Sequence, residues 1–144
     1  MLQPIRVLFL CDGNADRSLM AEGLLRSCGS ERFEVHSAGV APETPTAPTD
    51  LAVAVMQEAG VDISQQRSKC LNDYEDLQFD YVVTFCEQTK SSCLAFPRDA
   101  HNEHWQCIDP GEVQGSDADQ LAAFRQARDE ISARLRSWLA ARTD

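Results

Sequence analysis

The sequence predicts an α/β fold, a three-layer α/β/α domain with a small four-stranded parallel sheet and an anion-binding loop after the first strand. Short runs of apolar, β-branched and aromatic residues alternate with segments of helical periodicity, which is typical of parallel sheets with right-handed crossovers. The loop CDGNADRS joins the first such run to a helical segment. At 144 residues, one domain spanning residues 1–144 is expected.

The strands are predicted from runs rich in Val, Ile, Phe and Tyr. The first run, IRVLFL, is short and apolar, and the third, DYVVTF, is the clearest of the others. A fourth, shorter strand is expected just before Asp109 and Pro110, since a proline breaks a strand. The predicted strands cover residues 5–10, 33–38, 80–85 and 104–107.

Capping signals locate two of the predicted helices. Thr49 is a suitable N-cap for a helix that ends near Gly60, because threonine accepts a backbone hydrogen bond and glycine stops a helix. Ser116 and Asp119 resemble a capping box for the C-terminal helix. A further helix follows the loop, and we expect it to begin near Ser18.

Composition excludes several classes of function. The chain carries 13 basic and 23 acidic residues, a formal net charge of −10, so nucleic acid is not expected as a partner. The longest apolar stretch, residues 51–56, is far shorter than the ~20 residues that a membrane span requires. The amino terminus shows no secretion signal. These features predict a cytoplasmic protein without membrane association.

Six cysteines raise the question of disulfides, metal or redox chemistry. In a reducing compartment, thiols persist as buried hydrophobes, metal ligands or redox catalysts. No C-x2-C pair occurs, and the three histidines lack zinc spacing with the cysteines, so no metal site is expected. The cysteines are at positions 11, 28, 70, 86, 93 and 107.

The first loop carries the clearest chemical signal. Cys11 ends the predicted strand, and Arg17 follows after five residues at the start of a helix. Backbone N–H groups and the helix N-terminus can surround a tetrahedral oxyanion, and the same field is expected to lower the pKa of Cys11. Arg17 can bind two anion oxygens at once. A buried cysteine beside an unrelated arginine is the alternative, which the accompanying Gly13, Asn14 and Ser18 disfavour.

Beyond this loop, the chain resembles a known superfamily along nearly its whole length. CDGNADRS followed by LMAEGLLR is similar to the phosphate-binding loop of the low-molecular-weight protein tyrosine phosphatases. The segments HSAG, VDIS, FDYVVTFC, EHWQCIDP and LAAFRQARDEI are similar to the thioredoxin-coupled arsenate reductases of that superfamily.

The resemblance implies reduction of arsenate to arsenite. The Cys11 thiolate would attack arsenic, Arg17 and the loop amides would stabilise the oxyanion, and Asp109 would act as general acid. Cys86 and Cys93 would complete an intramolecular relay of disulfides that thioredoxin or another thiol donor reduces. No tightly bound cofactor is implied.

The position of Cys86 agrees with this relay. It follows a predicted parallel strand, and in an open parallel sheet the carboxyl ends of the strands share one edge, where Cys11 also lies. Cys93 comes after six further residues, EQTKSS. Cys107, close to Asp109, is the alternative resolving thiol.

The loop departs from the family pattern at three positions. Asp12 and Asp16 stand where neutral residues are usual, and Ala15 where serine is common. Two carboxylates beside an anion site should weaken the binding of a dianion, by ~1 kcal/mol or less per charge after screening by solvent.

The resemblance also implies a group of residues that supports the loop. Asn14, Glu22 and Ser37 match positions that structure the loop and, in some members, bind potassium. Lys69 stands where those members use a further carboxylate, and its ammonium could replace the ion.

Two alternatives remain open. A tyrosine phosphatase or small phosphate-ester phosphatase would need Cys11, Arg17 and Asp109, but neither Cys86 nor Cys93. No aromatic residue directly follows Pro110 to hold a phosphotyrosine ring. A catalytically degenerate anion-binding domain would follow if the two additional loop carboxylates abolished turnover.

Overall fold

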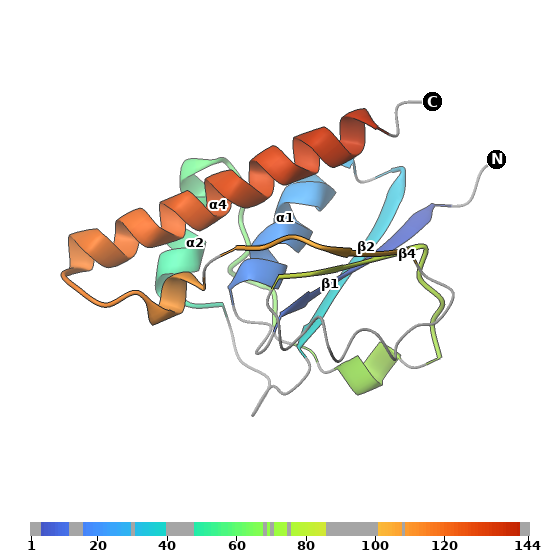
Figure 1. Ribbon diagram of the computed structural model, residues 1–144, viewed down its shortest axis with the longest axis horizontal. Coiled ribbons are helices and arrows are strands. Elements are labelled where there is room, and N and C mark those ends of the chain that lie inside the picture. The colour runs from blue at the N-terminus through green and yellow to red at the C-terminus, as the bar shows by residue number, and fades with distance from the viewer. Residues whose placement is uncertain are drawn as a thin grey trace.

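A single parallel sheet forms the centre of the computed structural model (Figure 1). The structure describes residues 4–11, 16–29, 31–39, 48–67, 69, 71–74, 76–85, 101–107 and 109–141. Its strands are β1 (Ile5–Cys11), β2 (Phe33–Gly39), β3 (Tyr81–Thr84) and β4 (His101–His104), in the order β2-β1-β3-β4. The predicted four-stranded parallel sheet is confirmed.

Three α-helices of the described residues, α1 (Arg17–Gly29), α2 (Asp50–Glu58) and α4 (Asp117–Ala140), pack on one face of the sheet. The long α4 crosses over α1 and α2 in Figure 1. The other face is covered by the 3-10 helix η1 (Leu71–Tyr74) and the segment after it. Helical elements therefore lie on both sides of the sheet.

Alternation along β1 directs its side chains to the two faces. Leu8 and Leu10 belong to the core on the η1 side. Phe9 and Cys11 belong to the larger core beneath the α-helices. The sulfur of Cys11 thus lies at the carboxyl end of a central strand, on the side of α1.

The fourth strand lies three residues earlier than the sequence suggests. Residues 104–107 were predicted, but β4 is His101–His104, paired with Tyr81–Thr84. The apolar signal came from Trp105 and Cys107, which are buried beyond the paired segment. Strand β4 lies at the edge of the sheet and is built from half-buried and exposed polar residues, so it has no apolar alternation to identify it.

The predicted helix caps are confirmed. The Thr49 side chain accepts a hydrogen bond from the backbone of Ala52, and Gly60 follows α2 with φ of 79°. That positive φ suits glycine, which has no Cβ to clash. Ser116 and Asp119 form a complete capping box at the start of α4.

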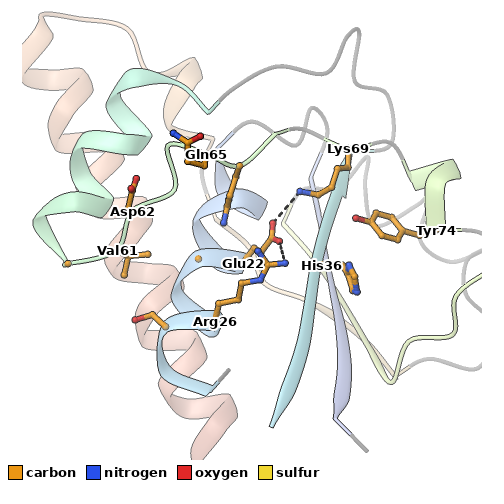
Figure 2. A pocket seen from close by; sticks show the side chains of 12 residues that line it. Glu22, Arg26, His36, Val61, Asp62, Gln65, Lys69 and Tyr74 are labelled. Carbon is orange, nitrogen blue, oxygen red and sulfur yellow. Dashed lines mark hydrogen bonds and ion pairs between the residues drawn. The ribbon is translucent and has the colours of Figure 1, made fainter. Parts of the chain in front are cut away.

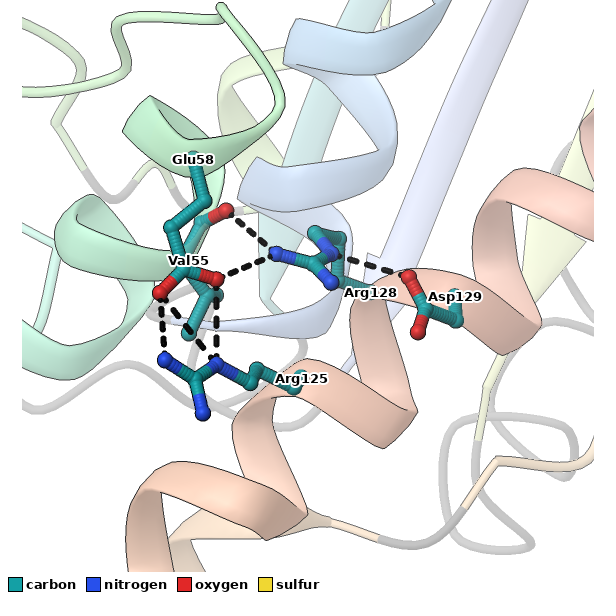
Figure 3. Close-up of polar contacts among 5 residues, drawn as sticks. All are labelled: Val55, Glu58, Arg125, Arg128 and Asp129. Atoms are coloured by element: carbon teal, nitrogen blue, oxygen red, sulfur yellow. Dashed lines mark hydrogen bonds and ion pairs between the residues drawn. The ribbon is translucent and has the colours of Figure 1, made fainter.

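Polar side chains also join the elements. Arg26 of α1 donates from Nη2 to the carbonyl oxygen of Val35, 2.8 Å away in the edge strand β2. Figure 3 shows Glu58 of α2 held by Arg125 and Arg128 of α4. None of the described helices is sufficiently long and apolar to span a membrane.

Candidate active site

Cys11 and Ser18 face each other across the start of α1. Cys11 is the last residue of β1 and is 3% exposed, and its Sγ lies 2.8 Å from the Oγ of the fully buried Ser18. Asp16 begins the helical hydrogen bonding, since its carbonyl accepts from the backbone of Met20. A hydroxyl at this distance can donate to a thiolate and so stabilise a charged sulfur.

Arg17 binds backbone carbonyls that follow the neighbouring strands β3 and β4. Its guanidinium is buried, with the residue only 4% exposed. Nη1 donates to the carbonyls of Phe85 (3.3 Å) and Cys107 (2.9 Å), which follow β3 and β4. Nη2 lies 3.6 Å from Oδ2 of Asp109. A buried cation requires such partners, and they fix Arg17 at the carboxyl edge of the sheet.

Two carboxylates approach this edge from different elements. Asp109 precedes the 3-10 helix η2 (Pro110–Glu112), and its Oδ1 accepts from the backbone of Gly111 at 3.0 Å. Asp16 accepts a 2.6 Å hydrogen bond from the hydroxyl of Thr49. Burial raises the pKa of the Asp16 carboxyl, the Thr49 hydrogen bond opposes this, and the Asp109 charge adds to the increase.

Cys107 is a poor candidate for thiol chemistry. It is 7% exposed, and burial raises the pKa of its thiol to about 12, with the Glu130 carboxylate acting in the same direction. The thiolate is the nucleophile in disulfide exchange, so Cys107 stays in the unreactive form near neutral pH. Its contribution to the site is the backbone carbonyl that Arg17 holds.

A second polar cluster surrounds the buried carboxylate of Glu22. Oε1 accepts from the hydroxyl of Ser37 at 2.6 Å and lies 3.4 Å from Nζ of Lys69, while Oε2 lies 2.7 Å from Arg26. Lys69 also donates to the carbonyl of Arg67 at 2.9 Å. Figure 2 shows Glu22 between its two cations, at a cavity of about 580 Å³.

The predicted site residues therefore fall into three groups. Cys11, Asp16, Arg17, Ser18 and Asp109 meet at the carboxyl edge of the sheet. The loop-support residues Glu22, Ser37 and Lys69 meet around one carboxylate. The remaining predicted residues lie outside the described part of the chain, namely Asp12, Gly13, Asn14, Ala15, Cys86 and Cys93.

Two contributors were not predicted from the sequence. Thr49 was identified as a helix cap, but its hydroxyl also binds Asp16, 33 residues earlier, and no local pattern signals that contact. Arg26 was overlooked although it follows Glu22 by four residues, a spacing that places two side chains on one helix face. Within the described residues, no group of three or more His, Cys, Asp or Glu side chains could hold a metal ion.

Comparisons of the sequence with a family model and with individual proteins point to the same family. The model of the low molecular weight phosphotyrosine protein phosphatase family matches residues 6–143. A protein of Halalkalibacterium halodurans named arsenate reductase is 38% identical over 133 residues, covering 92% of this chain and 93% of its own. A Bacillus subtilis protein of the same name is 36% identical over 134 residues, with coverage of 92% and 93%.

Solved structures similar to this chain include arsenate reductases and a protein tyrosine phosphatase. An arsenate reductase in a phosphate-binding state aligns with a TM-score of 0.74 and 28% identity, covering 95% of this chain and 98% of its own. A low molecular weight protein tyrosine phosphatase from T. tengcongensis aligns with a TM-score of 0.82 and 25% identity, with coverage of 95% and 99%. A thioredoxin-dependent arsenate reductase from Corynebacterium glutamicum has a TM-score of 0.74 and 28% identity, with coverage of 98% and 63%.

Proposed function

This chain belongs to the low molecular weight phosphotyrosine protein phosphatase family, and from that premise we propose that it is an arsenate reductase, converting arsenate to arsenite. The proposal is supported by relatives of that name that are 36–38% identical to it over more than nine-tenths of the chain. The structural observation that carries it is Arg17. Its buried guanidinium donates to the carbonyl of Phe85, the residue before Cys86, and lies 3.6 Å from the carboxylate of Asp109.

The first chemical step forms a sulfur–arsenic bond. The Cys11 thiolate attacks arsenic, and one arsenic–oxygen bond breaks. Asp109 gives its proton to the departing oxygen, which leaves as water, and Arg17 stabilises the charge on the remaining oxygens. Ser18, 2.8 Å from Sγ, stabilises the thiolate before the attack.

The second step reduces arsenic. The Cys86 thiolate attacks the sulfur of Cys11, the sulfur–arsenic bond breaks, and its electron pair remains on arsenic, which departs as arsenite. Cys93 then attacks Cys86 and releases Cys11, leaving a disulfide between Cys86 and Cys93. Thioredoxin or another dithiol donor supplies two electrons and two protons to reopen that disulfide. Cys93 is preferred to Cys107 as the resolving thiol, because Cys107 is buried and burial raises the pKa of its thiol to about 12.

Phosphatase activity is the second candidate, because Cys11, Arg17 and Asp109 would serve both reactions and a phosphatase shares the fold. Phosphotyrosine recognition lacks support, since Pro110 is followed by Gly111, Glu112 and Val113 rather than by an aromatic side chain. We expect arsenate reduction to dominate over hydrolysis of aryl phosphates.

Potassium does not fit the cluster around Glu22 as this chain builds it. The Lys69 ammonium already contacts the Glu22 carboxylate and the carbonyl of Arg67. A potassium ion bound there would be repelled by the positive charge of Lys69. We propose that Lys69 supplies the positive charge that other family members obtain from the ion.

The test is arsenate turnover coupled to a thioredoxin system, followed by disulfide mapping after a single turnover. Cys11→Ser should abolish turnover, because a hydroxyl cannot replace the thiolate. Cys86→Ser should stop at the Cys11 adduct, whereas Cys93→Ser should complete one round and stop with Cys11 bonded to Cys86. Cys28→Ser is the matched control, since Cys28 is exposed on α1 and should turn over normally.

Two results would contradict the proposed relay. One is normal cycling of the Cys93 variant, and the other is a mapped bond between Cys86 and Cys107. Hydrolysis of an aryl phosphate with Cys86 and Cys93 dispensable, and no reduction of arsenate, would identify a phosphatase instead. Binding of oxyanions with neither reaction would identify a degenerate domain.

A further inference from the structure

Asp16 is an additional carboxylate at the carboxyl edge of the sheet, and the mechanism above does not use it. The residue is half-buried and immediately precedes Arg17. Its Oδ1 accepts the 2.6 Å hydrogen bond from Thr49, the N-cap of α2. While this hydrogen bond holds, the carboxylate does not turn toward solvent, so its charge stays beside the start of α1.

The second carboxylate oxygen of Asp16 lies close to Gly111, in the 3-10 helix that follows Asp109. A Cβ placed on Gly111 would lie 3.3 Å from Oδ2 of Asp16 and 3.4 Å from Oδ1 of Asp109. Both carboxylates therefore border one small space. Asp16 thus adds a second carboxylate to the edge of the sheet that holds Cys11 and Arg17.

Arg17 is the cation beside these two carboxylates. In the part of the chain that the structure describes, Asp109 and Arg17 are the charged groups that act on Asp16. Nη1 of Arg17 already donates to two backbone carbonyls, those of Phe85 and Cys107. An anion is therefore left with the Nε and Nη2 side of the guanidinium, where Nη2 is 3.6 Å from Asp109.

The charges at this edge favour an anion of low charge. One guanidinium is opposed by the Cys11 thiolate that the reaction requires and by the carboxylate of Asp16, before Asp109 is counted. Each further negative charge on a bound anion is repelled by this excess, and partial burial of Asp16 reduces the screening by solvent. Arsenate, like phosphate, loses its second proton near neutral pH, so it is present there as a monoanion and as a dianion.

We propose that Asp16 is a specificity-determining residue that makes the site select the monoanion of arsenate over the dianion. This inference rests on the proposed function, in which arsenate is the substrate. The monoanion carries two hydroxyl groups, one of which leaves as water when Asp109 protonates it. The monoanion also repels the attacking thiolate of Cys11 less than the dianion would. Binding of arsenate should therefore weaken as the pH rises through its second ionisation.

The first experiment measures the binding of two tetrahedral anions whose charge does not change with pH, the monoanion perchlorate and the dianion sulfate. Each is titrated into the protein at about pH 8 and low ionic strength, and dissociation constants are read from backbone amide shifts in NMR spectra. Asp16→Asn removes one negative charge and keeps an oxygen for Thr49. Affinity should rise roughly threefold for perchlorate and about ninefold for sulfate, because the repulsion is proportional to the charge of the anion.

Asp50→Asn is the matched control for this experiment. Asp50 is an exposed carboxylate at the first position of α2, and its replacement makes the same change in net charge. Both dissociation constants should stay within about twofold of the parent's, because an exposed charge is screened by solvent and salt. Asp16→Ser repeats the test with a second neutral side chain, so that the result does not depend on how asparagine affects folding.

The second experiment measures kcat and KM for arsenate across the second ionisation of arsenate. In the parent, KM should rise as the dianion replaces the monoanion. In Asp16→Asn, this rise should be smaller, so the ratio of the two KM values should grow with pH. Added salt should reduce the difference between the two proteins, because screening acts on charge.

The two experiments separate the possible failures. A parent that discriminates against sulfate through Asp16 but does not reduce arsenate contradicts the proposed function and leaves the charge selection standing. The inference itself is overturned if Asp16→Asn changes the affinities for perchlorate and sulfate equally, or changes neither, since a charge effect must scale with the anion. It is also overturned if Asp50→Asn has the same effect as Asp16→Asn, which would assign the effect to net charge alone.

Discussion

Two carboxylates in this chain, Glu22 and Glu58, each hold two cations but lie in opposite environments. The Glu22 side chain is 2% exposed and interacts with Arg26 and Lys69. The Glu58 side chain is 39% exposed and interacts with Arg125 and Arg128 of α4 (Figure 3). Each carboxylate forms two ion pairs, so the clusters differ in whether water can solvate the carboxylate.

This difference in solvation determines how much each cluster contributes to the stability of the fold. Water can solvate an exposed carboxylate that loses a partner, and such pairs contribute little to stability. A buried carboxylate has no such replacement, and a broken buried pair leaves an uncompensated charge. Glu22 also joins α1, which begins at Arg17, to Ser37 in β2 and to Lys69. Replacement of Glu22 should therefore also affect the active site, because Arg17 lies on the same helix.

The largest effect is expected for Glu22→Gln. The amide keeps an acceptor for Ser37 but leaves the ammonium of Lys69 without its counter-charge. We expect the free energy of unfolding at neutral pH to fall by about 3 kcal/mol, measured by urea denaturation. Glu58→Gln is the matched control and should lose much less. Equal losses in the two variants would show that burial does not distinguish the clusters.

A smaller effect is expected for Lys69→Met, which leaves Glu22 with Arg26. Unfolding free energy should fall by about 1 kcal/mol. The parent's thermal midpoint should be the same in potassium and sodium chloride, whereas the variant's should rise in potassium. Arg67→Met is the control, since the Arg67 side chain is exposed and contacts only a backbone carbonyl among its described interactions. A potassium-dependent midpoint in the parent would contradict the role given to Lys69.

The smallest effect at neutral pH belongs to Glu58→Gln, and it should depend on pH. Hydrogen bonds from Arg125 and Arg128 lower the pKa of Glu58 to about 2. Ionised Glu58 therefore stabilises the fold above about pH 4.5, its value when unfolded, and this contribution disappears as the pH falls toward 2.

Unfolding midpoints in urea, measured for parent and Glu58→Gln across this pH range, should converge toward the acid end. The same difference should shrink in high salt, because exposed pairs are screened. Asp129→Asn is a suitable control, since Asp129 is 69% exposed and contacts Arg128 without bridging to α2. A difference that persists at pH 2 would contradict the assignment to Glu58.

Much of the fold could be predicted from local sequence. Buried central strands are continuous apolar runs, so β1 and β3 were located within a residue or two. The caps at Thr49 and Ser116 were also found, because capping depends on neighbours within three residues. Strand β4 was misplaced because edge pairing, and not side-chain burial, defines its ends.

In the candidate site too, the features that are local in sequence were predicted and the long-range contacts were not. Cys11, Arg17 and Ser18 form a compact motif, and the sequence alone indicated an anion-binding loop there. Thr49 was missed as a site residue because its partner is 33 residues away. The carbonyl acceptors of Arg17 lie 68 and 90 residues away, and backbone carbonyls leave no trace in residue type. Such contacts become visible only after the strands are aligned.

The contact between Arg26 and Val35 has a consequence for self-association. Strand β2 is an edge of the sheet, and unpaired carbonyls at such an edge invite a strand from another copy to add to it. The guanidinium of Arg26 occupies one of these acceptors and places a charge where an incoming strand would lie. Oε2 of Glu22 lies 2.7 Å from the same Nη2 and so helps to orient the guanidinium. We therefore expect the buried carboxylate of Glu22, through Arg26, to disfavour the pairing of β2 with a strand of another copy.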